Sequence, residues 1–287
     1  MLVLIQGGTV WPWDSAPVIL LFFIFVCGLG LFVKQERKAR EPIMPLSIWQ
    51  NRLISTANIA SLTTGVIMIG VTTFLPTYVQ GVLGKSPTVA GFTLGAMSIG
   101  WPLAAAAAGR LILKVGVRST ALLGGVLLVI GGILFVLLGL VNTTVWAATG
   151  SLLIGAGMGF SSTTFIIAIQ NSVNWSTRGV ATAANMFMRI VGNTVGAALL
   201  GGMLNVGIKA YLVGNGGGNY AGQDVTNLLL SPVTRNKLST SMLTLAEKGL
   251  TFGLHRVYLV VLAFALISLV CIAFLPKVTK FSEKEII

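Results

Sequence analysis

The sequence has 287 residues, of which 55% are hydrophobic and only 9% are charged, and its mean hydropathy is +0.90. Soluble globular domains carry about 25% charged residues, so this composition excludes a soluble protein, a disordered segment and a nucleic-acid-binding module. The formal net charge of +12 comes from 19 lysines and arginines against seven acidic residues. Because the basic residues lie between long apolar runs, their charge is interpreted against a lipid bilayer rather than against nucleic acid.

Seven apolar runs are long enough to cross the hydrocarbon core of a bilayer, which requires about 20 residues per helix. In chain order, the predicted transmembrane helices are 17–33, 55–79, 88–109, 120–141, 146–170, 180–205 and 257–275. These runs are too long for the strands of a membrane barrel and lack the alternation of polar and apolar residues that such strands have. The predicted fold class is therefore all-α, a polytopic membrane protein with seven transmembrane helices.

The basic residues predict the orientation of these helices. Segments 34–54, 110–119 and 171–179 and the tail after 275 lie on one side of the membrane and hold 12 of the 19 basic residues. By the positive-inside rule this side is cytoplasmic. We therefore expect a multi-pass protein of the plasma membrane with its carboxyl terminus in the cytoplasm and its amino terminus outside.

The start of the chain is unusual for this topology. Residues 1–16 have no basic residue and lack the features of a signal peptide, yet they are placed outside. We expect the chain to be the carboxyl-terminal part of a longer protein; an internal start codon, a truncated gene or a fragment would each give this sequence.

The chain divides into two predicted parts. Residues 1–54 form an external loop, one transmembrane helix and a basic cytoplasmic connection, and residues 55–287 form a six-helix domain with a long external loop at 206–256. Apolar residues recur at helical spacing in the second half of that loop, namely Leu238, Met242, Leu245 and Phe252. This spacing predicts a short amphipathic helix on the membrane surface or on the bundle.

Polar content separates the six helices of the domain. The order is polar, intermediate and apolar, then polar, polar and apolar, a three-plus-three pattern found in some secondary transporters. Helices 55–79 and 146–170 each place small, hydroxyl or soft side chains on one face, namely Asn58, Ser61, Met68 and Thr72 on the first and Ser151, Met158, Ser162 and Phe165 on the second. Such faces suit a cavity for amphipathic molecules, but they equally suit close packing between helices.

Arg189 is the one charge well inside a predicted transmembrane helix. Asn185 and Asn193 lie one helical turn on either side, which gives a polar stripe. An intramembrane charge normally faces a partner, a backbone carbonyl or water. We predict a role in a transport path or a domain interface; the alternative is a buried arginine satisfied by backbone carbonyls.

Several motifs resemble those of the major facilitator superfamily. More narrowly, they resemble the carboxyl half of the fourteen-helix drug:proton antiporter family, the EmrB/QacA type. They include Trp11-Pro-Trp-Asp-Ser15, Glu41-Pro-Ile-Met-Pro-Leu46, Thr72-Thr-Phe-Leu-Pro-Thr-Tyr-Val-Gln80 and Arg178-Gly-Val-Ala-Thr-Ala-Ala-Asn185. The resemblance extends over essentially the whole chain and implies a six-helix carboxyl-terminal bundle preceded by one further helix.

Residues 109–118 resemble the cytoplasmic signature loop of the superfamily. Gly109, Gly116 and Arg118 fit its pattern, whereas Leu113 stands where the pattern has an acidic residue. An ion-pair latch through position 113 is therefore not expected.

The resemblance also implies a function. It makes the first and fourth helices of the domain line a central cavity, so the eight residues on their two faces are the candidate substrate contacts. It implies proton-driven export of hydrophobic, often cationic, amphipathic compounds. The implied partners are the lipid bilayer, such a substrate and a missing amino-terminal half of the transporter, with no nucleic acid.

Several functions remain to be weighed against efflux of many drugs. An exporter of one dedicated metabolite, or another carrier of the same superfamily, would have the same motifs, and a seven-helix receptor would have a similar topology. The sequence has no spacing of catalytic or metal-ligating residues, so no enzymatic activity, metal or cofactor is expected. All seven acidic residues lie in predicted loops or tails, so we expect no proton-driven transport by this chain alone.

Overall fold

The computed structural model describes residues 15–38, 46–217, 225–235 and 239–276. These residues form helices and no strand. The helices are α2 (Ala16–Lys38), α3 (Arg52–Gly81), α4 (Pro87–Val115), α5 (Val117–Val136), α6 (Leu138–Val141), α7 (Thr144–Asn171), α8 (Arg178–Gly214), α9 (Val225–Leu230), α10 (Pro232–Arg235) and α11 (Thr240–Ala273), with short 3-10 turns at η1 (Leu46–Gln50) and η2 (Trp175–Thr177).

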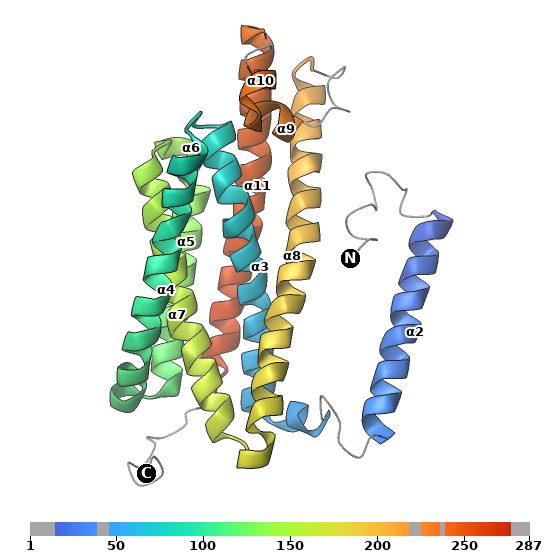
Figure 1. Ribbon diagram of the computed structural model, residues 1–287, viewed down its shortest axis with the longest axis vertical. Coiled ribbons are helices and arrows are strands. Elements are labelled where there is room, and N and C mark those ends of the chain that lie inside the picture. The colour runs from blue at the N-terminus through green and yellow to red at the C-terminus, as the bar shows by residue number, and fades with distance from the viewer. Residues whose placement is uncertain (1–14, 39–45, 218–224, 236–238, 277–287) are drawn as a thin grey trace.

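The all-α, polytopic membrane fold predicted from the sequence is confirmed. Helices α3, α4, α5, α7, α8 and α11 are long and apolar enough to cross a membrane, and α2 carries a shorter apolar stretch at Ile19–Gly28. Helix α2 stands beside the other helices in Figure 1. Its apolar side chains, such as Phe23 and Leu31, are largely exposed, which suits contact with lipid.

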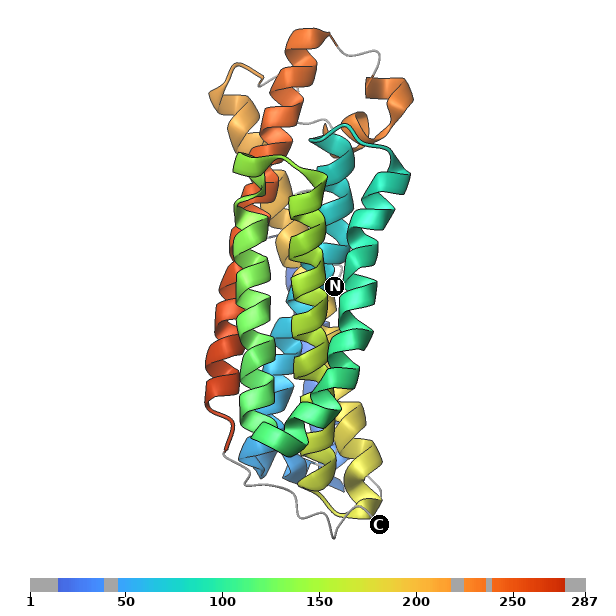
Figure 2. The ribbon, with the colours of Figure 1, turned by 90° about the vertical axis from the view of Figure 1, so that its left-hand side faces the viewer.

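The six long helices are arranged in two layers. One layer, which we call the front layer, consists of α4, α7, α3 and α8 packed side by side in that order, and α5 and α11 pack together behind it (Figures 1 and 2). The chain order divides into two three-helix repeats, α3-α4-α5 and α7-α8-α11. The first helix of each repeat packs on the second helix of the other, giving the α3–α8 and α4–α7 contacts.

Polar side chains define where several of these helices begin. The side chains of Asn51, Ser86, Thr143 and Ser239 accept hydrogen bonds from backbone N–H groups in the first turns of α3, α4, α7 and α11, respectively. These N–H groups have no partner within the helix, so the caps stabilise the helix ends.

Two helices are longer than the apolar runs predicted. Helix α8 continues past residue 205 to Gly214, and α11 begins at Thr240 rather than at residue 257. The expected loop 206–256 is therefore wrong in extent and shrinks to 215–239. Hydropathy detects only the part of a helix that matches the bilayer, about 20 residues, whereas α8 has 37 residues and α11 has 34.

The prediction of a separate, short amphipathic helix is also wrong. Met242, Leu245 and Phe252 belong to the first turns of α11, and Leu238 lies outside the described residues. The extension is held at the end of α3, because Arg235 donates a hydrogen bond to the carbonyl oxygen of Gln80 at 3.1 Å and forms an ion pair with Glu247 at 2.5 Å.

The connections alternate between the two ends of the bundle as the sequence predicts. The start of α3, the α4–α5 and α7–α8 junctions and the end of α11 lie at one end, the lower end in Figure 1. That end carries Arg52, Arg110, Lys114, Arg118 and Arg178. The predicted external segment 1–14 and the basic tail from 277 onward lie outside the described residues.

Candidate functional site

A buried polar cluster joins α3 to α8 in the lower half of the bundle. Asn185 accepts a hydrogen bond from the hydroxyl of Ser61 at 3.1 Å and donates one from its amide to Asn58 Oδ1 at 3.0 Å. All three side chains are buried. Two predicted substrate contacts, Asn58 and Ser61, are thus held by the predicted polar stripe and connect the two helices.

The cluster is possible because the two backbones approach closely. A Cβ atom on Gly65 would overlap the carbonyl oxygen of Arg189, and one on Gly192 would overlap that of Leu62. Glycine at these positions lets polar groups on facing helices come within hydrogen-bonding distance. The small residues of α3 therefore serve helix packing here.

Arg189 extends from α8 towards α4. Its guanidinium carbon lies 5.7 Å from the ring centroid of Trp101, within the range of a cation–π contact. Within the described part of the chain this is its one recorded partner, and it makes no hydrogen bond or ion pair there. Asn193, one turn further along, has a buried Oδ1 without a hydrogen-bond partner among the described residues. The predicted stripe thus divides into a satisfied amide, a guanidinium with free donors and an unpaired acceptor.

The second predicted face, on α7, turns mainly into the contact with α4. Ser151 is fully buried and its hydroxyl donates a long hydrogen bond of 3.4 Å to the carbonyl oxygen of Leu94. A Cβ atom on Gly155 would overlap the carbonyl oxygen of Met97. Met158 and Phe165 are buried as well, in apolar clusters of the bundle.

The eight predicted substrate contacts therefore differ in accessibility. Five of them are buried between helices in this conformation, namely Asn58, Ser61, Ser151, Met158 and Phe165. The other three, Met68, Thr72 and Ser162, are half-buried. Helical spacing did not specify which neighbour each face meets.

Trp101 is a residue that the sequence reasoning missed. It is half-buried in the middle of α4 and faces Arg189 across the front layer. The available signal was an aromatic ring followed by Pro102 in the middle of an apolar helix, but the polar content of α4 is only intermediate and does not single out this position.

Of the predicted signature loop 109–118, only Gly116 lies outside a helix, at the junction of α4 and α5. Gly116 separates α4 from α5 with φ = 85°, a conformation that favours glycine, and its N–H donates to the carbonyl oxygen of Ile112. Gly109 lies within α4. Arg118 donates a hydrogen bond of 2.6 Å to the carbonyl oxygen of Ala273, the last residue of α11, so it caps that helix.

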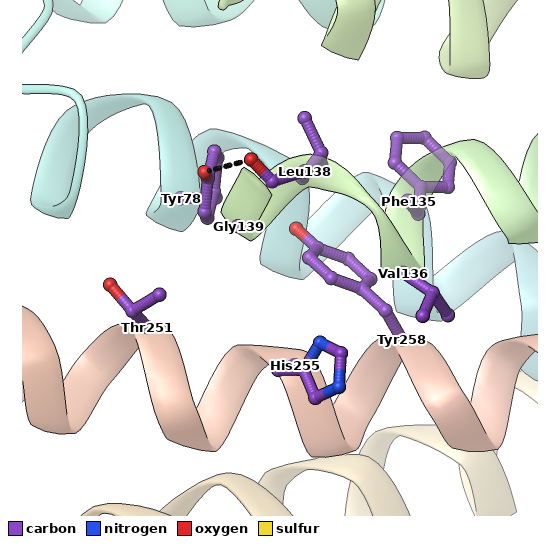
Figure 3. Close-up of a pocket in the computed structure, with 8 residues that line it drawn as sticks. All are labelled: Tyr78, Phe135, Val136, Leu138, Gly139, Thr251, His255 and Tyr258. Carbon is purple, nitrogen blue, oxygen red and sulfur yellow. Dashed lines mark hydrogen bonds between the residues drawn. The ribbon is translucent and has the colours of Figure 1, made fainter. Parts of the chain in front are cut away.

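A small pocket lies at the opposite end, between α3, α5, α6 and α11 (Figure 3). The hydroxyl of Tyr78 lies 2.8 Å from the carbonyl oxygen of Leu138, and the ring of Tyr258 stacks on Phe135 at 5.4 Å. Its lining includes residues of α5 and α11, the two helices behind the front layer. It is therefore separate from the face that carries Arg189 and Trp101.

Comparison with known proteins identifies the family. The profile of the Major Facilitator Superfamily matches residues 2–197. The chain belongs to the major facilitator superfamily. It is thus a multi-pass membrane protein of a transporter family, a membership that leaves the seven-helix receptor without support.

Three relatives illustrate this membership. The chain is 30% identical over 205 residues to the multidrug transporter protein MdtP of Bacillus subtilis, covering 71% of this chain and 38% of that protein. It is 33% identical over 201 residues to multidrug resistance protein 3 of the same organism, covering 70% and 39%. It is 27% identical over 298 residues to the MFS-type efflux transporter ffsH of Aspergillus flavipes, covering 98% and 51%. The chain thus spans about two fifths to half of the length of these relatives.

Proposed function

We propose that this chain is the carboxyl-terminal half of a proton-coupled multidrug efflux transporter of the fourteen-helix type, exporting hydrophobic or cationic compounds. Two of its relatives are named as multidrug proteins, and they are more than twice as long as the aligned part of this chain. In this proposal the front layer of α4, α7, α3 and α8 faces a second, amino-terminal helical bundle, with the substrate path between the two.

The observation that carries the proposal is Arg189, a charged residue within the long apolar helix α8 of the front layer. A guanidinium facing lipid at the bilayer centre costs about 3 kcal/mol on insertion scales, so this layer is suited to face protein or water. The exposed side chains within one turn of it on α8 are apolar, namely Met186, Phe187 and Ile190. A wide apolar surface with one polar position is the expected lining for amphipathic substrates.

We expect the chain alone to be inactive in proton-driven transport. In the described residues the two carboxylates are Glu36, near the end of α2, and Glu247, in the outer extension of α11. Neither lies mid-membrane, and a guanidinium stays protonated at neutral pH. A proton relay normally uses membrane-embedded carboxylates or histidines, so the proposal places the coupling groups in the other bundle.

The test reconstitutes the chain in liposomes, either alone or together with the amino-terminal half that the proposal requires. A pH gradient is imposed and the uptake of ethidium is followed by fluorescence. We expect uncoupler-sensitive accumulation with both halves and none with the chain alone. Accumulation by the chain alone would contradict the need for a second bundle, and none by the pair would contradict drug efflux.

Substrate contacts in this half are proposed at the eight residues named from the sequence, with Met68, Thr72 and Ser162 the most accessible. Single cysteines at these three positions in the assembled transporter should react with a small water-soluble maleimide, and substrate should protect them. Cysteines at Leu123 and Ile130, exposed positions of α5 outside the front layer, are the matched controls. Equal labelling at the α5 positions would contradict the assignment.

We further propose that the end carrying Arg52, Arg118 and Arg178 is cytoplasmic in a plasma membrane, following the positive-inside rule. A cysteine at exposed Lys114 should then be protected from a membrane-impermeant maleimide in intact cells, whereas one at Lys85 should be labelled. The reverse pattern would invert the topology.

A second candidate function is export of one dedicated metabolite. The observation favouring it is that a further relative, 32% identical over 211 residues, is named as the acurin A biosynthesis cluster MFS-type transporter. A panel of unrelated cationic and neutral dyes separates the two candidates. Export of several dyes supports multidrug efflux, and export of none, with activity towards a single compound, supports the dedicated exporter.

A further inference from the structure

The contact between Arg189 and Trp101 lies deep in the membrane and joins helices at opposite edges of the front layer. The start of α8 and the end of α4 lie at the same end of the bundle, the lower end in Figure 1. Arg189 is eleven residues beyond the start of α8, and Trp101 is fourteen residues before the end of α4. At 1.5 Å per residue these positions are about 16 and 21 Å along their helices. Both therefore lie near the centre of a hydrocarbon core about 30 Å thick.

The guanidinium in this position has unused hydrogen-bonding capacity. The guanidinium carbon lies 5.7 Å from the centroid of the Trp101 ring, and no hydrogen-bond acceptor among the described residues pairs with the guanidinium N–H groups. No carboxylate forms an ion pair with it in the described part of the chain, where the single recorded ion pair is Arg235–Glu247. An aromatic ring beside the guanidinium limits the orientations that its N–H donors can adopt.

The charge of Arg189 itself favours an anionic acceptor, whereas the polar groups next to it are either already paired or are acceptors themselves. The backbone next to it packs on Gly65 of α3, and the satisfied amide of Asn185 lies one turn towards the end that carries Arg178. One turn in the other direction, Asn193 Oδ1 is buried and unpaired among the described residues. A guanidinium edge binds a carboxylate through two parallel N–H···O bonds, which are stronger than bonds between neutral groups.

We propose that Arg189 and Trp101 form a mid-membrane binding site for a carboxylate group, with the aromatic ring orienting the guanidinium edge towards the ligand. The carboxylate can come from an acidic substrate or from a side chain of the amino-terminal bundle. Binding is a property of this chain alone, whereas the role of the site in transport rests on the proposed function.

The test measures binding of 2-naphthoate to the complete chain in nanodiscs of neutral lipid, with binding to empty nanodiscs subtracted. We expect Arg189→Gln and Trp101→Leu each to weaken naphthoate binding by about tenfold or more, because each removes a charged or orienting contact. Naphthylmethylamine, which has the same ring system with the opposite charge, should bind more weakly and be insensitive to both changes. Arg256→Gln is the matched control, since Arg256 lies 4.6 Å over Phe252 near the other end of the bundle.

The outcomes separate the site from its alternatives. Naphthoate binding that is unchanged by Arg189→Gln, or equal binding of the amine, would overturn the proposal. If Arg189→Gln prevents folding, Trp101→Leu and the comparison of the two probes still test it. Absence of drug transport by the assembled halves would overturn the proposed function but leave this binding result standing.

Assembly with the amino-terminal half distinguishes the two sources of the carboxylate. If that half supplies it, naphthoate binds the isolated chain but not the assembled transporter, and removing the acidic partner side chain restores binding. If the substrate supplies it, naphthoate binding survives assembly and competes with transport. If naphthoate binds neither the isolated chain nor the assembled transporter, the proposed carboxylate site is wrong.

Discussion

The α3–α8 and α4–α7 contacts occupy equivalent places in the two repeats but are built differently. Both bring backbones together through glycine, at Gly65 and Gly192 in the first and at Gly155 and Gly159 in the second. The first contact adds a buried amide–amide–hydroxyl cluster around Asn185, whereas the second adds one long hydroxyl bond from Ser151.

This difference shows that close approach of two helix backbones and a fixed register between the two helices have separate causes. Close approach needs only small residues, and both contacts have it. Buried amides add a penalty for misalignment, because a shift of one helix along the other would leave each donor and acceptor unpaired in a low-dielectric interior. The α3–α8 contact is therefore expected to fix one register, and it holds the backbone from which Arg189 extends. The α4–α7 contact has less to prevent a small shift.

The largest expected effect comes from adding one carbon at the glycines of either contact. Gly192→Ala and Gly155→Ala should each lower the free energy of unfolding by about 3 kcal/mol, because a carbonyl oxygen already occupies the space. Titration of the chain with SDS in mixed micelles measures this.

Gly201→Ala on α8 and Gly95→Ala on α4 are the matched controls, since nothing lies within 4 Å of an added Cβ at either position. They should leave stability unchanged or raise it slightly, since alanine is the better helix former. Equal losses at all four positions would show that close approach is not the cause.

Asn185→Leu removes the buried hydrogen bonds that distinguish the α3–α8 contact from the α4–α7 contact. This change leaves Asn58 Oδ1 and the Ser61 hydroxyl without their partner, and we expect a loss of about 1–2 kcal/mol in unfolding free energy. The change should also weaken naphthoate binding at Arg189, one turn away, by loosening the register. Asn205→Leu, at an exposed position on the same helix, is the control and should do neither.

Much of the fold was predictable from the sequence because the bilayer imposes a single length scale. Each long apolar run became a helix, except that 120–141 is divided at Leu137 into α5 and α6, and the alternating basic connections came to lie at one end. The extent of α8 and α11 was not predictable from hydropathy. Residues such as Glu247, Lys248 and Arg256 lower the hydropathy where α11 runs beyond the apolar core, although they continue the same helix.

The candidate site was less predictable, for a reason particular to membranes. Polar and small residues on a transmembrane helix mark a face that avoids lipid, but that face can meet water, a substrate or another helix. Asn58 and Ser61 meet α8, so periodicity found the face but not its neighbour. Arg189 was recognised because charge is rare at that depth, whereas Trp101 was missed because an apolar ring on an apolar helix carries no such signal.

The smallest expected effect is the sharpest test of the comparison, because it uses the same substitution in both contacts. Ser61→Ala removes the donor to Asn185 and leaves a buried amide oxygen unpaired, so the unfolding free energy should fall by about 1 kcal/mol. Ser151→Ala removes a bond of 3.4 Å, near the limit of useful geometry, to a carbonyl oxygen inside α4 that keeps its own helical partner. Its effect should stay within about 0.5 kcal/mol, with the gain in helix propensity offsetting the lost bond. Both serines are buried and lie mid-helix, so differences in exposure do not explain a gap between them. If the two alanine variants lose the same stability in SDS titrations, the α3–α8 cluster contributes no specificity beyond that of the α4–α7 contact, and the register argument for Arg189 is wrong.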